Sequence, residues 1–235
     1  LLDAIMGDFA ERHGKARWSE KSPGQPIELA ADLFPQAQFV HIVRDPRDVV
    51  ASSLRTPWAA VPDAGAIARS WRDYTLRTVR RGFALGPARF LQIRYEDLTR
   101  DPAAVLELVC AFLGEPYAPA MVDDPSLRAG TVTSVGAPWQ QRALAGIVPA
   151  QEGRWREQLG RRQKASVHAV VAPVLAPLGY DATAGRLLAL SARLVRAGEP
   201  LRRLRTRRQA PPPSSPEELY RRTRAFTDAQ AARIA

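Results

Sequence analysis

Apolar and polar positions follow two different rhythms along most of the chain. Apolar residues that recur every three or four positions predict helices, and short apolar runs predict strands. The predicted strands are residues 16–20, 39–43 and 89–94. The predicted helices are residues 1–12, 26–33, 46–55, 65–82, 102–113, 138–145, 155–160 and 162–178. Strands that alternate with helices indicate an α/β fold in which a parallel sheet is flanked by helices.

The domain-like pattern ends near Tyr180 and divides the chain into two parts. Residues 1–184 are long enough for one α/β domain with a sizeable core. Within this domain, residues 123–152 are rich in Gly, Pro, Ser and Thr, which predicts a long loop or a mobile lid. Residues 185–235 form an extension whose leucine stripe predicts two short helices rather than one, because Pro200 interrupts it.

The net charge of +10 is concentrated in the extension. Residues 185–235 carry 12 Arg and four acidic residues, whereas residues 1–184 carry 22 Lys and Arg and 20 acidic residues. A nearly neutral domain argues against a core that binds nucleic acid. The extension has the pattern of a weak contact with an anionic membrane or an acidic partner, but a solvated basic tail is the favoured alternative.

Cysteine and histidine usage excludes several classes of site. The single cysteine, Cys110, lies in an apolar helical segment and excludes an internal disulfide framework. The three histidines are scattered without metal-ligand spacing, so we expect no metal site. No signal-peptide pattern opens the sequence and no apolar run is long enough for a membrane span, so we expect a cytoplasmic protein.

The most informative pattern is a junction between a strand and a helix. The apolar strand stops at Arg44, Asp45 and Pro46 are a helix-start signal, and Asp48 completes a capping-box-like pair. Ser52 lies about two turns into the helix. A guanidinium, a hydroxyl and a helix N-terminus that converge at a strand end predict an anion site. A capped, salt-bridged helix without a ligand explains the same residues about equally well.

This junction resembles the 3′-phosphate-binding motif of the sulfotransferase family, an Arg at a strand end with a Ser eight residues later. Other segments agree with the family in order and spacing: WSEKSP at 18–23, RYEDL at 94–98 with Asp-Pro at 101–102, and GRWR at 153–156. The resemblance covers about residues 1–180, and four motifs in order are more specific than one. It implies a mostly parallel α/β sheet related to P-loop nucleotide kinases, and transfer of a sulfuryl group from 3′-phosphoadenosine 5′-phosphosulfate to a hydroxyl or amine.

The resemblance also assigns residues on the nucleotide side. It implies that Arg44 and Ser52 bind the 3′-phosphate, that Arg154 reaches the same phosphate from a late loop, and that Tyr95 contacts the adenosine side. The alternative for Tyr95 is a core tyrosine with a satisfied hydroxyl. The alternative for Arg154 is a solvated arginine at a helix start.

On the reaction side, the resemblance points to Lys21, which lies 23 residues before Arg44. A cation there would stabilise charge on the bridging oxygen, although a surface lysine is the usual alternative. Cytosolic members of the family place a catalytic His two residues after this Lys. The present sequence has Pro23 there, which leaves Glu20 as a weak substitute for the base.

One family feature is missing from this sequence. No Gly/Ser/Thr-rich loop that could cradle the 5′-phosphosulfate precedes Lys21, so we expect the fold to be N-terminally incomplete. Two functions stay open: a sulfotransferase that acts on a small-molecule, glycan or peptide acceptor, and a non-catalytic protein that binds 3′-phosphonucleotides or partners with half of the site. A P-loop kinase is less favoured, because a Gly-x-x-x-x-Gly-Lys loop is absent from the sequence.

Overall fold

The computed structural model describes four stretches of the chain, residues 2–21, 27–56, 63–124 and 152–182. At the centre of this part lie two parallel strands, β1 (Phe39–Val43) and β2 (Phe90–Arg94). Their register pairs Phe39 with Phe90 and Val43 with Arg94, so both strands end at the same edge. The predicted mixture of helices with a small parallel sheet is therefore confirmed for the described residues.

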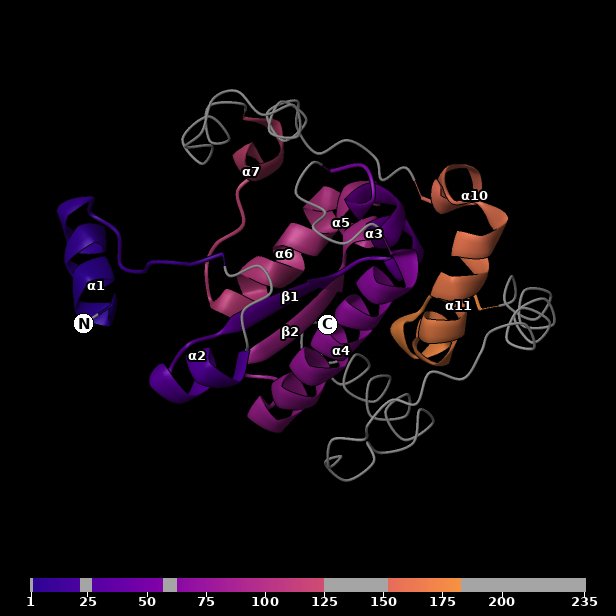
Figure 1. The fold of residues 1–235 in the computed structure, drawn as a ribbon. Helices are drawn as coiled ribbons and strands as arrows, with labels where there is room; N and C mark the ends of the chain where they lie inside the picture. The colour runs from indigo at the N-terminus through magenta and orange to yellow at the C-terminus, as the bar shows by residue number, and fades with distance from the viewer. Residues whose placement is uncertain (1, 22–26, 57–62, 125–151, 183–235) are drawn as a thin grey trace.

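Helices enclose this pair of strands (Figure 1). The strands run between α4 (Ala64–Leu85) and α6 (Pro102–Leu113), and α4 also packs against α3 (Pro46–Ser53) and α11 (Arg161–Leu175). The other described elements are α1 (Leu2–Arg12), α2 (Ile27–Leu33), α5 (Tyr95–Arg100), α7 (Ala120–Asp123), α10 (Trp155–Gln158) and the 3₁₀ turn η1 (Ala176–Leu178). Within the described residues, none of the helices has both the length and the apolar character that a membrane span requires.

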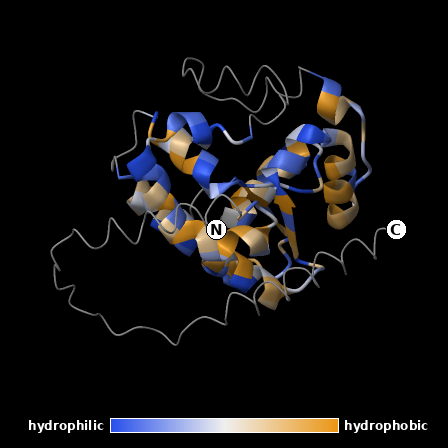
Figure 2. Cartoon of the chain, turned by 90° about the vertical axis from the view of Figure 1, so that its right-hand side faces the viewer, coloured by the Kyte–Doolittle hydropathy of each residue, from blue (hydrophilic) through white to orange (hydrophobic). Residues whose placement is uncertain are grey.

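The hydrophobic core forms where the end of β1 meets α3, α4 and α11. Branched aliphatic side chains of β1, α3 and α11 supply much of it, and α4 contributes two small residues: Val43, Val50, Val167, Val171 and Leu175, with Ala64 and Ala68. Figure 2 shows the hydrophobic strands between helices of mixed hydropathy. Because burial of each such side chain contributes about 1.5–3 kcal/mol, this cluster fixes α3 and α11 relative to the strand ends.

Several predicted elements differ in the structure. The predicted strand at 16–20 is wrong: these residues are not in a strand and pair with no strand among the described residues, and Trp18 instead packs edge-on against Phe34. The first helix is confirmed, but Ile5 and Phe9 on its apolar face are 55% and 56% exposed. Helix α5 was not predicted, because six residues are too few for a helical period to be visible.

Other predictions concern parts of the chain that lie outside the described residues. These are the helix at 138–145, nearly all of the loop at 123–152 and the whole basic extension at 185–235. The two alternatives for the extension, a solvated basic tail or a weak contact with an anionic membrane or acidic partner, and the missing 5′-loop therefore stay predictions. In the described residues that precede β1, the structure has the helices α1 and α2.

We predict that Gly82→Ala destabilises the fold. Gly82 is buried in α4, and a Cβ at this position would overlap the ring of Phe90, which is fully buried and cannot move aside. Overpacking should lower the free energy of unfolding by about 1–3 kcal/mol in urea denaturation, despite the better helix propensity of Ala. The control is Gly7→Ala in α1, where a Cβ meets nothing within 4 Å and should stabilise the chain slightly. Equal stability of the two variants would contradict the close approach of α4 to β2.

A second prediction concerns His41 in β1, whose Nδ1 lies 3.3 Å from Oε1 of Gln92 on the paired strand. Burial lowers the pKa of His41 from 6.5 to about 4, and the hydrogen bond to Gln92 offsets only part of this effect. The unfolded chain therefore binds this proton at a higher pH than the folded chain. The stability that His41 contributes should be complete above pH 6.5 and should fall by about 3 kcal/mol as the pH drops toward 4. Denaturation of wild type and His41→Gln at both pH values should show a smaller loss in the variant.

Candidate anion-binding site

Arg44 and Tyr95 lie together at the carboxyl edge of the two strands. Arg44 directly follows β1, and Tyr95 directly follows β2, so the parallel register makes them neighbours. The guanidinium carbon of Arg44 is 4.6 Å from the centroid of the Tyr95 ring. Among the described residues no carboxylate forms an ion pair with Arg44. A cation at a strand end, held by a ring rather than a counter-ion, is suited to receive an anion.

Ser52 lies in the last turn of α3 with its side chain exposed. Arg55 follows within the same turn, because its backbone N–H donates to the carbonyl of Ser52 at 3.1 Å. With the amide oxygen of Gln158 turned toward α3, it accepts hydrogen bonds from Arg55 Nη1 at 2.9 Å and from Arg154 Nε at 3.2 Å. Residues from two distant segments thus place two guanidinium groups beside each other at the end of α3.

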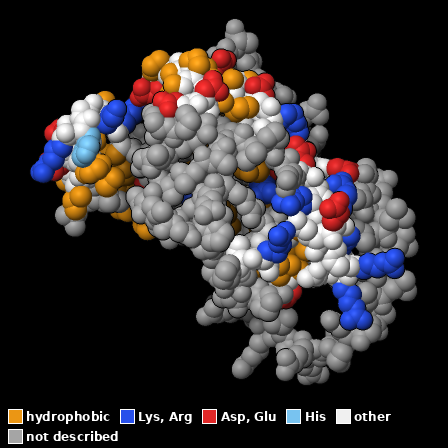
Figure 3. Space-filling model, turned by 90° about the horizontal axis from the view of Figure 1, so that it is seen from above, with side chains coloured by type: hydrophobic (Ala, Val, Ile, Leu, Met, Phe, Trp, Pro, Cys, Tyr) orange, Lys and Arg blue, Asp and Glu red, His pale blue; other side chains and the backbone are white. Residues whose placement is uncertain are grey.

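These two arginines share one neutral acceptor, the amide of Gln158. In the described part of the chain neither Arg55 nor Arg154 forms an ion pair with a carboxylate. Seen from above, Lys and Arg side chains gather at the end of the molecule formed by α10 and α11 (Figure 3). Two like charges held this close attract an anion, and sequence reasoning singled out only Arg154 of the pair.

Arg47, the second arginine of the junction, has the opposite environment. Its side chain is buried, and its Nε and Nη2 donate to the carboxylate of Asp45 at 2.9 and 2.7 Å. Nη1 donates to the carbonyl oxygen of Asp181 at 2.9 Å, and the guanidinium lies over the ring of Trp155. All of its donor groups are thus directed into the protein, so Arg47 holds the site together and is not available to a ligand.

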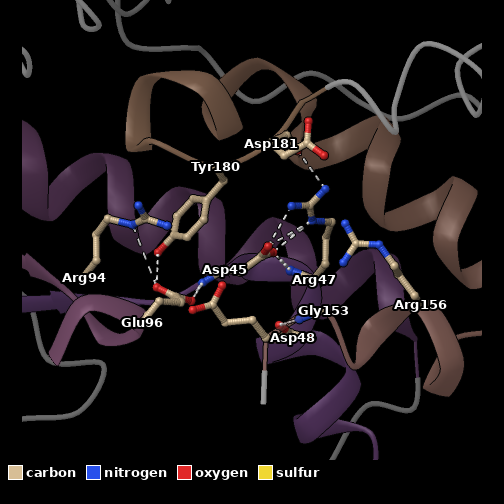
Figure 4. A pocket seen from close by; sticks show the side chains of 10 residues that line it. Asp45, Arg47, Asp48, Arg94, Glu96, Gly153, Arg156, Tyr180 and Asp181 are labelled. Atoms are coloured by element: carbon tan, nitrogen blue, oxygen red, sulfur yellow. Dashed lines mark hydrogen bonds and ion pairs between the residues drawn. The ribbon is translucent and has the colours of Figure 1, made fainter. Parts of the chain in front are cut away.

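Glu96 connects the junction to the end of the described domain (Figure 4). This buried carboxylate accepts from the backbone N–H of Asp45 at 2.8 Å and from the Tyr180 hydroxyl at 3.1 Å. Burial, and then the negative charge of Glu96, raise the pKa of Tyr180 above its ordinary value, so the hydroxyl stays a donor. Together with Arg47 and Arg94 these groups line a pocket of about 240 Å³ that contains charges of both signs.

The capping-box interpretation of Asp48 is wrong. Asp45 caps α3 as expected, because its carboxylate accepts from the backbone N–H of Arg47 at 2.9 Å. However, the backbone N–H of Asp45 donates to Glu96, and Asp48 points instead at the loop before α10. The partners of Asp48 lie more than 100 residues away, so no local pattern could have identified them.

The reaction-side residues lie elsewhere. Lys21 and Glu20 are exposed in the segment between α1 and α2. No contact within the described residues joins Lys21 to Arg44, Ser52 or Tyr95. The structure therefore brings together the candidate nucleotide-side residues in two groups, Arg44 with Tyr95 and Arg154 with the end of α3, and leaves Lys21 apart. No set of three metal-ligating side chains comes together among the residues that the structure describes.

Comparison with known proteins finds relatives among sulfotransferases. The chain is 30% identical over 99 residues to omega-hydroxy-beta-dihydromenaquinone-9 sulfotransferase of Mycobacterium bovis and of Mycobacterium tuberculosis, which covers 37% of this chain and 26% of each relative. It is 32% identical over 113 residues to human carbohydrate sulfotransferase 6, which covers 40% of this chain and 29% of the relative. The matched region is thus less than a third of each relative's own length.

A family-wide comparison extends beyond these pairs. The profile of the sulfotransferase family matches residues 1–119, slightly more than half of the 235-residue chain. This match includes Lys21, the junction from Arg44 to Ser52, and Tyr95, but it ends before Arg154. On this match, and on the strand-to-helix junction that it contains, the chain belongs to the sulfotransferase family.

Proposed function

We propose that this chain carries the nucleotide side of a site that transfers a sulfuryl group from 3′-phosphoadenosine 5′-phosphosulfate to an acceptor. The observation that supports this most directly is the guanidinium of Arg44, which stacks on Tyr95 at the carboxyl edge of the parallel strands and forms no ion pair with a carboxylate of the described residues. Open α/β sheets bind ligands at this edge, and the start of α3 adds the positive end of a helix dipole.

In this proposal the 3′-phosphate is bound by Arg44 and by the hydroxyl of Ser52. Arg154 approaches from the loop before α10, and Arg55 adds a cation at the end of α3. Tyr95 contacts the adenosine side while it holds the Arg44 guanidinium. Phosphate fits these residues because three guanidinium groups, none paired with a carboxylate in the described part of the chain, supply the charge and the planar donors that phosphate oxygens require.

The reaction itself would be an in-line transfer. The acceptor oxygen or nitrogen attacks the sulfur, the bond between sulfur and the bridging oxygen breaks, and the acceptor proton passes to a base. Lys21 would stabilise the negative charge that develops on the bridging oxygen, and Glu20 is the candidate base that the described residues offer. Both residues would have to approach the donor from the segment between α1 and α2.

The acceptor is proposed by class only. One relative is named for an omega-hydroxylated menaquinone and another for carbohydrate, and both classes of compound carry hydroxyl groups. A hydroxyl on a small molecule or a glycan is therefore favoured over an amine. A protein that binds 3′-phosphonucleotides without turnover is the second candidate, because Lys21 lies apart from the nucleotide-side residues in the described part of the chain.

We predict that Arg44→Ala weakens binding of adenosine 3′,5′-bisphosphate by about 2–4 kcal/mol, the loss expected for a charge-assisted contact in a polar pocket. Binding of adenosine 5′-monophosphate, which lacks the 3′-phosphate, should hardly change. Isothermal titration calorimetry of both ligands measures this difference. The matched control is Arg12→Ala, which removes an exposed arginine of α1 and should leave both affinities unchanged. Equal losses for the two ligands would reject the assignment of Arg44 to the 3′-phosphate.

We also predict that Lys21→Ala lowers turnover by roughly two to three orders of magnitude, because a cation aimed at developing charge acts on the transition state. The affinity for adenosine 3′,5′-bisphosphate should stay within about twofold of wild type, since ground-state binding rests on other residues. Lys15→Ala is the control, because Lys15 is exposed in the same segment. Turnover within about threefold of wild type would identify Lys21 as an ordinary surface residue.

A further inference from the structure

Asp48 joins the first turn of α3 to a loop that lies more than 100 residues later in the chain. One carboxylate oxygen accepts from the backbone N–H of Gly153 at 2.8 Å, and the other accepts from the backbone N–H of Trp155 at 2.8 Å. Figure 4 shows the carboxylate directed at Gly153. The two oxygens of one carboxylate thus both bind the backbone of residues 153–155.

In the described part of the chain, the hydrogen-bond partners of this carboxylate are backbone amides. Asp48 is 4% exposed, and among the described residues no Lys or Arg forms an ion pair with it. A buried charge is costly unless hydrogen bonds satisfy it. Here the satisfying groups are the two loop amides, helped by the N-terminal dipole of α3. Because these amides stabilise the charge, Asp48 and the loop depend on each other.

The residue held between the two amides is Arg154. On its N-terminal side Gly153 has φ of +78°, a left-handed conformation that turns the loop toward α3. On its C-terminal side Trp155 is buried, with the guanidinium groups of Arg47 and Arg156 stacked over its ring at 4.6 and 4.8 Å. The backbone of Arg154 is therefore fixed at both ends, and its side chain extends to Gln158, beside Arg55.

We propose that Asp48 is a positioning residue of the anion site, which acts through Arg154 and never touches the ligand. By fixing residues 153–155 against α3, it places the Arg154 guanidinium beside Arg55 and the turn that carries Ser52. This inference rests on the proposed function, because the anion that the paired arginines receive is taken to be the 3′-phosphate. Asp48, although negatively charged, would therefore favour the binding of an anion.

The sign of the predicted effect separates this role from simple electrostatics. If Asp48 acted only through its charge, its removal would strengthen the binding of an anion nearby. If Asp48 acts through Arg154, its removal weakens binding, because the loop is released and Arg154 leaves the side of Arg55. Asp48→Asn tests this, since the amide has the same shape but offers one acceptor oxygen where two amides need to donate.

The experiment is a double-mutant cycle on the full chain with adenosine 3′,5′-bisphosphate in isothermal titration calorimetry. Asp48→Asn and Arg154→Ala should each weaken binding by about tenfold, and the double variant should be no weaker than Arg154→Ala alone within about twofold. The matched control is Asp63→Asn, because Asp63 also accepts from a backbone amide, that of Gly65 at 2.8 Å, and caps a different helix. Asp63→Asn also removes one negative charge, and its affinity for adenosine 3′,5′-bisphosphate should equal that of wild type.

Amide hydrogen exchange of the ligand-free protein distinguishes release of the loop from a general loss of stability in Asp48→Asn. In amide hydrogen exchange, the N–H groups of Gly153 and Trp155 should exchange faster in Asp48→Asn, while the N–H of Leu91 in β2 stays protected. Loss of protection at all three would indicate global unfolding, and the comparison would then use Asp48→Glu, which keeps both acceptors and should restore part of the affinity.

The outcomes distinguish this inference from the proposed function. Binding by Asp48→Asn at or above wild-type strength, while Arg154→Ala is weak, would overturn the role of Asp48 and leave the proposed function intact. A full additional loss from Asp48→Asn in the Arg154→Ala background would show that Asp48 acts through another residue, which also overturns it. A wild-type chain that does not bind the bisphosphate, or an Arg44→Ala variant that binds it normally, would overturn the proposed function itself.

Discussion

The candidate site depends on one buried ion pair, between Arg47 and Asp45 at the start of α3. The carboxylate accepts from the backbone N–H of Arg47 and from its guanidinium, so a single side chain caps the helix and neutralises the arginine. The remaining nitrogen of Arg47, Nη1, donates to the Asp181 carbonyl. The planar face of the guanidinium packs on the ring of Trp155. Loss of one partner of such a buried pair typically costs about 3–5 kcal/mol, because the other charge stays buried without compensation.

Around this pair, buried carboxylates hold the backbone, and among the described residues the half-buried guanidinium groups of Arg44 and Arg154 form no ion pair with a carboxylate. Asp45, Asp48 and Glu96 are all buried, and each accepts a hydrogen bond from at least one backbone N–H. Their acceptor capacity is therefore directed into the protein. The arginines that reach the surface here, Arg44 and Arg154, contact a ring and an amide instead. This separation of roles leaves positive charge at the carboxyl edge of the strands, as an anion site requires.

Apolar runs and capping residues predicted those strands and helices that depend mainly on residues near in sequence. The strand at 39–43 and the helix at 102–113 were predicted with the observed bounds. The strand is an uninterrupted apolar run, and the helix begins with Pro after a capping Asp101 and ends before Gly114 in the left-handed region. The prediction of a strand at 16–20 failed because a strand must pair with another strand. The sequence of those five residues does not indicate whether a partner strand is available.

The sequence by itself determined the family, the parallel α/β class and the position of Arg44 at a strand end. It could not determine that Arg47, which follows the same Asp-Pro pair as a helix residue, is buried in an ion pair. Only the tertiary structure decides this, because the groups that bury Arg47, Trp155 and the Asp181 carbonyl, come from over 100 residues away. The same reason hid the role of Asp48, since burial and hydrogen-bond partners follow from chain segments that meet only in the fold.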